Sequence, residues 1–310
     1  MRRRAVVLAL LGAVLPVRAL AHPGRPVEPH DLWTAWAWEP WIVAGLLLSA
    51  WMYSRGVERV WRRSGVGRGI RRWQAGCFAA GWATLLVAMV SPLHPLGAAL
   101  FSAHMVQHEL LMVVAAPLLV LGRPVIPFLW ALPVGWRRRV GRWGKTGPVR
   151  AGWRAGTSPF AAWLLHGAAI WLWHLPALYQ STLHSEWMHT LQHASFLGTA
   201  LFFWWALVHG REGRMGYGAA VFYLFATAMH SGGLGALLTF TSRAWYPAYG
   251  SAAAAWGLTP LEDQQLAGLI MWVPAGISYL VAGLLLIAAW MRESERRAAR
   301  WQQRALPEPA

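Results

Sequence analysis

The sequence has 310 residues and a net charge of +16, with 56% hydrophobic but only 13% charged residues. Soluble domains carry about 25% charged residues, so this composition argues against a soluble globular protein. The 23 tryptophans favour a membrane protein instead, because tryptophan concentrates where lipid meets water. The single cysteine, Cys77, excludes an internal disulfide and any metal or redox motif that needs a pair of cysteines.

The first 21 residues have the pattern of a secretory signal peptide. Residues 2–4 are arginines, residues 5–15 form an apolar stretch too short to span a membrane, and residues 19–21 form a small-residue cleavage site. We therefore predict a signal peptide over residues 1–21 and a mature N-terminus at His22. An uncleaved first anchor is the alternative, because Arg18 lies close to the proposed cleavage site.

Seven later segments are apolar enough to cross a membrane as helices, which takes about 20 predominantly apolar residues. They cover residues 37–54, 73–91, 99–121, 159–179, 187–209, 217–240 and 266–291. The first segment is the weakest, because Glu39 lies at its start. We predict an all-α polytopic membrane protein, with one membrane domain over residues 22–291 and a basic cytoplasmic tail over residues 292–310.

Lysine and arginine are distributed unequally between the two sides of these segments. One side holds 22 of them, in residues 55–72, 122–158, 210–216 and 292–310, and the other side holds Arg25 and Arg243. This positive-inside pattern predicts an outer N-terminus and a cytoplasmic C-terminus. The basic loops would face anionic lipid headgroups, which explains the net charge without nucleic acid. Within the longest loop we expect residues 136–156 to be mobile.

Histidines gather near the predicted outer ends of the segments. His104 and His108 lie in the third segment, and His189 and His193 lie in the fifth. A spacing of four residues puts both rings of each pair on one face of a helix. Eight of the twelve histidines reach this level, namely His94, His104, His108, His174, His184, His189, His193 and His230. Such a concentration predicts a metal site, although any single ring could instead be a packed, hydrogen-bonded histidine.

The two histidine pairs share the pattern His-x-x-Gln-His. The matched glutamines, Gln107 and Gln192, could fix the tautomers of metal-bound rings by hydrogen bonding. Methionines, among them Met105, occur on the same segments. Imidazole combined with soft thioether sulfur suits copper, particularly Cu(I).

Several enzymatic motifs are missing from the sequence. His108-Glu109 lacks the second histidine of the zinc-protease motif, and neither a haem-attachment motif nor a Walker lysine occurs. We therefore expect a protein that is not an enzyme. We also expect the polar run 262–265, before the last segment, to be a solvated helix cap.

Six motifs, taken together and in order, resemble the CtaG family of multi-spanning cytochrome c oxidase assembly factors, as distinct from the single-pass copper chaperone of the same name. They lie at residues 53–56, 102–124, 171–176, 187–193, 230–235 and 263–274, and the resemblance covers approximately residues 36–291. It implies a role in the biogenesis of a haem–copper oxidase through copper delivery, in a bacterial plasma (inner) membrane. The expected partners are oxidase subunits and a periplasmic copper chaperone.

Carried over residue by residue, the resemblance implies a set of site residues. The expected metal ligands are His104, His108, His174, His189, His193 and His230. From the residue pattern itself, Gln107, Gln192, Met105 and Glu109 are expected around these ligands. Glu109 departs from the apolar residue usual after the first motif, which leaves the exact ligand set open.

Two other functions remain open at this point. Axial histidine pairs between helices could serve a haem-binding membrane oxidoreductase. Intramembrane histidines together with Glu109 could serve an ion or metal transporter, although acidic residues are otherwise nearly absent from the segments.

Overall fold

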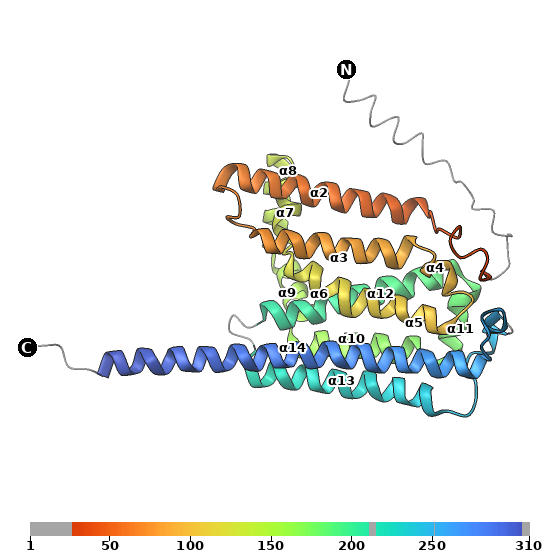
Figure 1. The fold of residues 1–310 in the computed structure, drawn as a ribbon. Helices are drawn as coiled ribbons and strands as arrows, with labels where there is room; N and C mark the ends of the chain where they lie inside the picture. Colours follow the sequence, from red (N-terminus) through yellow and green to blue (C-terminus); the bar gives the residue numbers. More distant parts are fainter. Residues whose placement is uncertain (1–26, 211–214, 251, 306–310) are drawn as a thin grey trace, which may run out of the picture.

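The computed structural model describes residues 27–210, 215–250 and 252–305, which form a bundle of helices (Figure 1). None of these described residues belongs to a β-strand, which confirms the all-α class. In chain order the elements are α2 (Pro40–Ser64), α3 (Arg72–Val90), α4 (Leu93–Leu96), α5 (Phe101–Glu109), the π-helix η1 (Leu110–Ala115), α6 (Ala116–Leu121), α7 (Val125–Ala131), α8 (Val134–Trp143), α9 (Gly147–Gly156), α10 (Pro159–Trp173), α11 (Pro176–His184), α12 (Glu186–His209), α13 (Tyr217–Phe240), the 3-10 helices η2 (Pro247–Tyr249) and η3 (Ala252–Trp256), and α14 (Pro260–Ala305). The predicted signal peptide lies outside the described residues.

Five helical stretches within the described residues are long and apolar enough to cross a membrane. They are α3, the continuous stretch from α5 through η1 to α6, α12, α13 and α14. These stretches match five of the seven predicted segments, so the chain is a multi-helix membrane protein. The last stretch is much longer than expected, because α14 continues as one helix to Ala305.

The other two predicted segments differ from a simple spanning helix. α2 is 25 residues long, but its second half carries charged residues such as Arg55, Glu58 and Arg59, which lower its hydropathy. α10 has only 15 residues and ends at Trp173, so the single helix predicted over residues 159–179 is wrong. Proline at position 176 disfavours helical backbone at the residue before it, and Leu175 is indeed extended before α11 begins.

The loop expected to be mobile at residues 136–156 is folded into α8 and α9 at one end of the bundle (Figure 1). Next to it, α7 packs closely against α2. A Cβ at Gly56 would lie only 1.9 Å from the backbone oxygen of Pro127. Arg59 strengthens this contact, because its guanidinium donates to the carbonyl oxygens of Trp130, Ala131 and Leu132 at the end of α7.

Small residues also let α13 and α14 approach each other closely. A Cβ at Gly235 would lie 2.8 Å from the backbone oxygen of Gly268, and a Cβ at Gly268 would lie 2.6 Å from that of Gly235. Membrane helices without bulky side chains at a crossing gain close backbone packing. The run of small residues after His230 thus packs the bundle.

The third span changes helix type in its middle. η1 is a π-helix that begins directly after Glu109, and Pro117 follows it in the first turn of α6. A proline inside a helix lacks an amide donor and clashes with the carbonyl four residues earlier, here that of Val113. The extra residue in each π-turn accommodates this clash. It also rotates the side chains that follow His108 relative to their positions in a regular α-helix.

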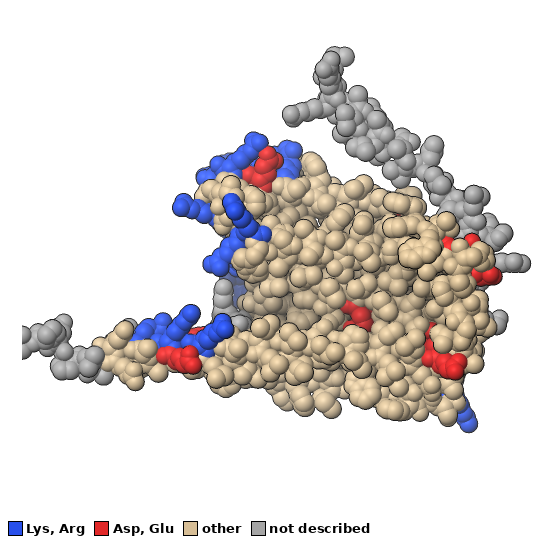
Figure 2. All heavy atoms as spheres, in the orientation of Figure 1, with Lys and Arg blue, Asp and Glu red and all other residues tan. Residues whose placement is uncertain are grey.

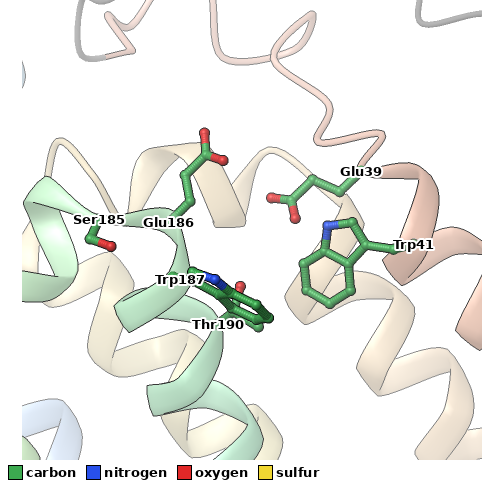
Figure 3. A pocket seen from close by; sticks show the side chains of 6 residues that line it. All are labelled: Glu39, Trp41, Ser185, Glu186, Trp187 and Thr190. Atoms are coloured by element: carbon green, nitrogen blue, oxygen red, sulfur yellow. The ribbon is translucent and has the colours of Figure 1, made fainter.

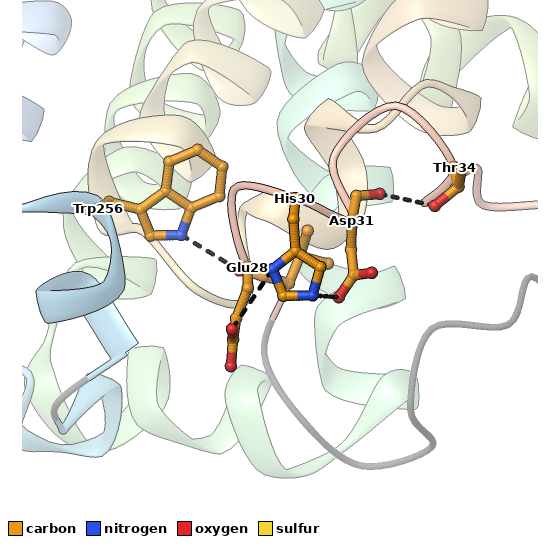
Figure 4. Close-up of polar contacts among 6 residues, drawn as sticks. Glu28, His30, Asp31, Thr34 and Trp256 are labelled. Atoms are coloured by element: carbon orange, nitrogen blue, oxygen red, sulfur yellow. Dashed lines mark hydrogen bonds and ion pairs between the residues drawn. The ribbon is translucent and has the colours of Figure 1, made fainter.

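Charge divides the bundle into two ends (Figure 2). We call the end with α4, α11 and residues 241–259 the histidine end, and the opposite end with α7, α8 and α9 the basic end. Most lysine and arginine side chains seen in Figure 2 gather at the basic end and on the far part of α14. At the histidine end the first described residues are tied down, because Trp256 donates from Nε1 to the carbonyl oxygen of Val27 (Figure 4).

The same N-terminal segment carries a small charged group beside this tie. The imidazole of His30 lies 3.6 Å from a carboxylate oxygen of Glu28 and 3.4 Å from one of Asp31 (Figure 4). The Thr34 hydroxyl closes the turn by donating to the carbonyl oxygen of Asp31. Acidic residues therefore accompany the histidines at this end of the molecule.

Candidate metal centre

Five histidine rings from three helices meet at the histidine end. Within each His-x-x-Gln-His motif the two ring centroids are 4.3 Å apart, for His104 with His108 and for His189 with His193. The two motifs also contact each other, since His193 lies 5.5 Å from His104 and 5.2 Å from His108. His94 on α4 completes the cluster, with its ring 5.2 Å from that of His189. The α5 and α12 motifs are therefore spatial neighbours.

The five rings form two groups of three, and the possible ligand atoms in each group lie within 4.8 Å of one another. We call His94, His189 and His193 the pocket group, and His104, His108 and His193 the buried group. Nitrogens bound to one tetrahedral ion at about 2.0 Å lie roughly 3.3 Å apart, so each group needs only a modest contraction to hold an ion. His193 belongs to both groups, which makes them adjacent sites with one common ligand.

Several ring nitrogens in the cluster are buried without a hydrogen-bond partner. His108 is 1% exposed, and neither its Nδ1 nor its Nε2 has one. The Nε2 atoms of His189 and His193 are also unpartnered. Buried polar atoms are nearly always hydrogen-bonded, so orphaned imidazole nitrogens in such numbers need another explanation. His166 and His230 each have one unpartnered ring nitrogen as well, but only in the cluster do such nitrogens converge, and this convergence fits a metal ion.

The glutamines of the two motifs contact different histidines. Gln107 donates from its amide to the carbonyl oxygen of Ala88 and lies 2.7 Å from Nδ1 of His94. Gln192 places its carbonyl oxygen 3.1 Å from Nε2 of His104. The Ala88 carbonyl fixes the Gln107 amide as a donor toward Nδ1 of His94, so an ion that binds His94 must replace either this contact or the one between Nε2 and Glu39. Each glutamine thus orients a ring that belongs to another element.

An open pocket of about 640 Å³ lies between the starts of α2 and α12 (Figure 3). Its lining residues are Glu39, Trp41, Ser185, Glu186, Trp187 and Thr190. Glu39 at the start of α2 and Glu186 at the start of α12 bring their carboxylates to the opening from opposite sides (Figure 3). Glu39 also lies 3.3 Å from Nε2 of His94, so it links the pocket directly to the cluster. Two carboxylates at the opening favour the approach of a cation.

His174 and His230, the other two expected ligands, occupy different places. The ring of His174 is 6.4 Å from that of His108, next to the buried group, and its Nε2 lies 3.5 Å from Sδ of Met105. His230 belongs to neither group. It packs edge-on against Trp163 at 5.6 Å, and its Nδ1 accepts from the indole of Trp171.

Glu109 lies directly after His108, at the start of the π-helix. Its side chain is 8% exposed, and its Oε2 has no hydrogen-bond partner. It belongs to neither group of three histidines. The structure therefore shows Glu109 as a buried carboxyl group next to His108 in the chain and leaves a ligand role unsupported.

A buried aspartate holds the helix that carries the first motif. Asp263 is 1% exposed and accepts hydrogen bonds from the backbone amides of Phe101 and Ser102 and from the Ser102 hydroxyl. A carboxylate at the amino end of a helix satisfies free amides and complements the helix dipole. The expectation of a solvated cap is wrong for this residue, because its carboxylate caps α5 instead of α14.

A group of tyrosines closes the space beside the buried group. Tyr246 donates to the carbonyl oxygen of His174, and Tyr249 donates to that of Gly97. Tyr179 lies 2.7 Å from the Tyr249 hydroxyl, and its ring is 5.3 Å from that of His104. Burial raises the pKa of the Tyr249 hydroxyl well above its usual value, so it remains a proton donor.

Sequence reasoning missed two members of this site. His94 was recognised only as one of eight histidines at the outer level, because it lies in a short turn outside the paired motifs. Glu39 entered only as a residue that weakens the first segment. A signal for both was present, since a lone carboxylate at the start of an apolar segment and a histidine between two prolines are unusual.

Comparison with known proteins gives the family. The family model described as "Cytochrome c oxidase caa3 assembly factor (Caa3_CtaG)" matches residues 51–293. "Uncharacterized protein Mb0105" from Mycobacterium bovis is 30% identical over 295 residues, covering 88% of this chain and 42% of that protein. "Uncharacterized protein ML1998" from Mycobacterium leprae is 28% identical over 305 residues, covering 91% of this chain and 43% of that protein.

The chain thus spans less than half the length of these curated relatives. No solved structure matches. The family match includes all five histidines of the cluster, whereas Glu39 lies before it. It confirms the resemblance seen in the motifs, and the chain belongs to the family of cytochrome c oxidase caa3 assembly factors.

Proposed function

We propose that the protein binds copper at the histidine end and delivers it to a cytochrome c oxidase, without catalysing a reaction of its own. The observation that carries this proposal is His108, which is fully buried with both ring nitrogens unpartnered between His104 and His193. Imidazole is a good ligand for copper, and the metal centres of haem–copper oxidases include copper, which an assembly factor would have to supply.

The two histidine groups give copper a way in and out. The pocket group adjoins the open pocket through Glu39, whereas the buried group is enclosed. An ion taken up by His94, His189 and His193 can pass to His104 and His108 without leaving His193. Exchange of one or two ligands at a time keeps the barrier to transfer low, and release to a partner follows the reverse route.

We further propose that the histidine end faces the non-cytoplasmic side of a bacterial plasma membrane. The gathering of lysine and arginine at the basic end supports this orientation, because basic loops stay in the cytoplasm (Figure 2). The open pocket would then face the compartment in which a copper chaperone and the exposed domains of oxidase subunits are found. Those two proteins are the partners we propose.

The geometry gives less support to a haem-binding oxidoreductase. Two axial histidines lie on opposite faces of a porphyrin, which must fit between their rings. The rings of both motifs instead contact each other directly, with centroids 4.3 Å apart. The cluster has the compactness of a small-ion site.

The test is the copper content of the purified full chain after loading with copper and removal of unbound metal. We expect bound copper in the wild type and in His184→Ala, which removes an exposed histidine at the same end but outside both groups. We expect His108→Ala to retain less copper. Copper at the background level in the wild type, or equal copper in all three proteins, would contradict the proposal.

A further inference from the structure

Met105 lies where the buried group faces α10. It follows His104 directly on α5 and is 1% exposed. Its sulfur points at the ring of His174. The Sδ–Nε2 distance is 3.5 Å. The residue pattern places this methionine around the expected ligands, and simple packing in an apolar helix is the ordinary role of methionine. The other contact of His174 shows why packing does not explain this arrangement.

The proton on His174 can be assigned from its second ring nitrogen. Nδ1 lies 2.6 Å from the carbonyl oxygen of Ile170, which can only accept, so Nδ1 must carry a hydrogen. A second proton on Nε2 would make a buried cation, and none of the ion pairs in the described part of the chain includes His174. Burying an unpaired charge is costly, so Nε2 is unprotonated.

The contact between Nε2 and Sδ therefore joins two acceptors. A thioether has no hydrogen to donate, and a neutral imidazole nitrogen presents a lone pair. Two buried lone pairs directed at one another gain nothing by hydrogen bonding. They become favourable when a cation accepts both, and soft sulfur with imidazole nitrogen is the ligand pair that Cu(I) selects.

The separation of the two atoms fits such an ion. With metal–nitrogen and metal–sulfur bonds of about 2.0 and 2.3 Å, a tetrahedral ion holds its two ligands roughly 3.5 Å apart. Met105 Sδ and His174 Nε2 are 3.5 Å apart in the protein. His108, with both nitrogens unpartnered and its ring 6.4 Å from that of His174, is the nearest member of the buried group to them.

We propose that Met105 and His174 form a nitrogen–sulfur ligand pair that makes the inner end of the histidine cluster selective for monovalent copper. This inference rests on the proposed function, since it takes copper as the cargo. It makes Met105 a ligand itself, beyond the expectation that Met105 lies around the ligands. It also defines a third position for the ion, after the pocket group and the buried group.

The experiment compares Met105→Leu with Met112→Leu in the purified full chain. Met112 is on the same span and is 4% exposed, so its replacement controls for the loss of a buried thioether. Cu(I) affinity is measured by competition with a coloured Cu(I) chelator, and Zn(II) affinity is measured in parallel. X-ray absorption at the copper edge reports whether sulfur is bound.

We expect Met105→Leu to weaken Cu(I) binding by about tenfold or more while Zn(II) affinity changes little, because zinc prefers nitrogen, carboxylate or thiolate ligands. The sulfur scatterer at about 2.3 Å should disappear in Met105→Leu and persist in Met112→Leu. Added to Met105→Leu, the change His174→Gln should cost little more, because the first change has already broken the pair.

Three outcomes would overturn the inference. They are an unchanged sulfur signal in Met105→Leu, an equal loss of Cu(I) and Zn(II) affinity, and fully additive effects of the two substitutions. Wild-type protein that binds copper through nitrogen alone would refute this inference and leave the proposed function standing. Wild-type protein that binds no copper would refute the proposed function, and the ligand pair would then be judged with Ag(I), a soft monovalent ion, on the same variants.

Discussion

The two His-x-x-Gln-His motifs have the same pattern but different surroundings. His104 and His108 on α5 are each 1% exposed, whereas His189 on α12 is only partly buried and adjoins His94 at the pocket. Their glutamines differ as well, since Gln107 contacts His94 and Gln192 contacts His104. The two copies of the motif therefore form different sides of one cluster. We call the side with His94 and His189 the access side and the side with His104 and His108 the enclosed side, and His193 belongs to both.

The largest expected effect follows from the position of His193 in both groups. We expect His193→Ala to lower copper affinity at least about 100-fold, since even residues that only orient metal ligands contribute about 10–100-fold. His94→Ala and His104→Ala each remove one group and should lower it less. Competition with a chelator gives the three affinities, and equal losses in all three variants would show that the groups do not share a ligand.

A second prediction separates the two sides by rate. His94→Ala should slow copper loading while leaving the loaded ion protected, because the buried group stays complete. His108→Ala should load at the wild-type rate but give up its copper quickly to a chelator. Stopped-flow measurements with the purified chain distinguish these behaviours. If both variants load and release copper at the same rates, the distinction between an access side and an enclosed side is wrong.

A third prediction concerns the support of the enclosed side. We expect Asp263→Asn to reduce the stability of the folded protein by about 1–3 kcal/mol. The amide nitrogen of asparagine would replace one of the two oxygens that accept hydrogen bonds from α5, and it cannot accept them. An exposed carboxylate on the far part of α14 provides the control, since Glu295→Gln should change stability by less than about 0.5 kcal/mol. Thermal unfolding in detergent measures both. Similar melting temperatures for Asp263→Asn and the wild type would remove Asp263 from the account.

The smallest effect is expected at the mouth of the pocket. Glu39→Gln should slow copper loading a few-fold at low salt and less at high salt, because screening shortens the reach of a surface charge. Glu28→Gln removes the same charge at the same end but outside the pocket lining, so its loading rate should remain close to that of the wild type. If copper loads at the wild-type rate in both Glu39→Gln and Glu28→Gln, the ion reaches the cluster by another route.

Much of the fold could be predicted from local pattern. Apolar length located five of the spanning stretches, and the spacing of four residues placed each histidine pair on one helical face. Pro176 could have predicted the break at Leu175, but the apolar residues on both sides of it hid the interruption. The folding of residues 136–156 into helices was missed because their arginines and glycines resemble a solvated loop.

The site was less accessible to sequence reasoning because its members come from distant parts of the chain. Asp263 caps a helix that begins 162 residues earlier, and no local sequence pattern predicts such a contact. The sequence predicts that His230 lies at the same end of the bundle as the cluster. Its ring instead packs against Trp163 and Trp171. Which histidines meet is decided by helix packing, and the sequence alone could supply only the candidates.

X-ray absorption at the copper edge of the loaded, full-length protein tests the central claim most directly. Our account predicts an absorbing ion whose nearest neighbours are mainly histidine nitrogens at about 2.0 Å, and a clear loss of that signal in His193→Ala. A spectrum dominated by water or detergent oxygens, identical in the wild type and in His193→Ala, would contradict it.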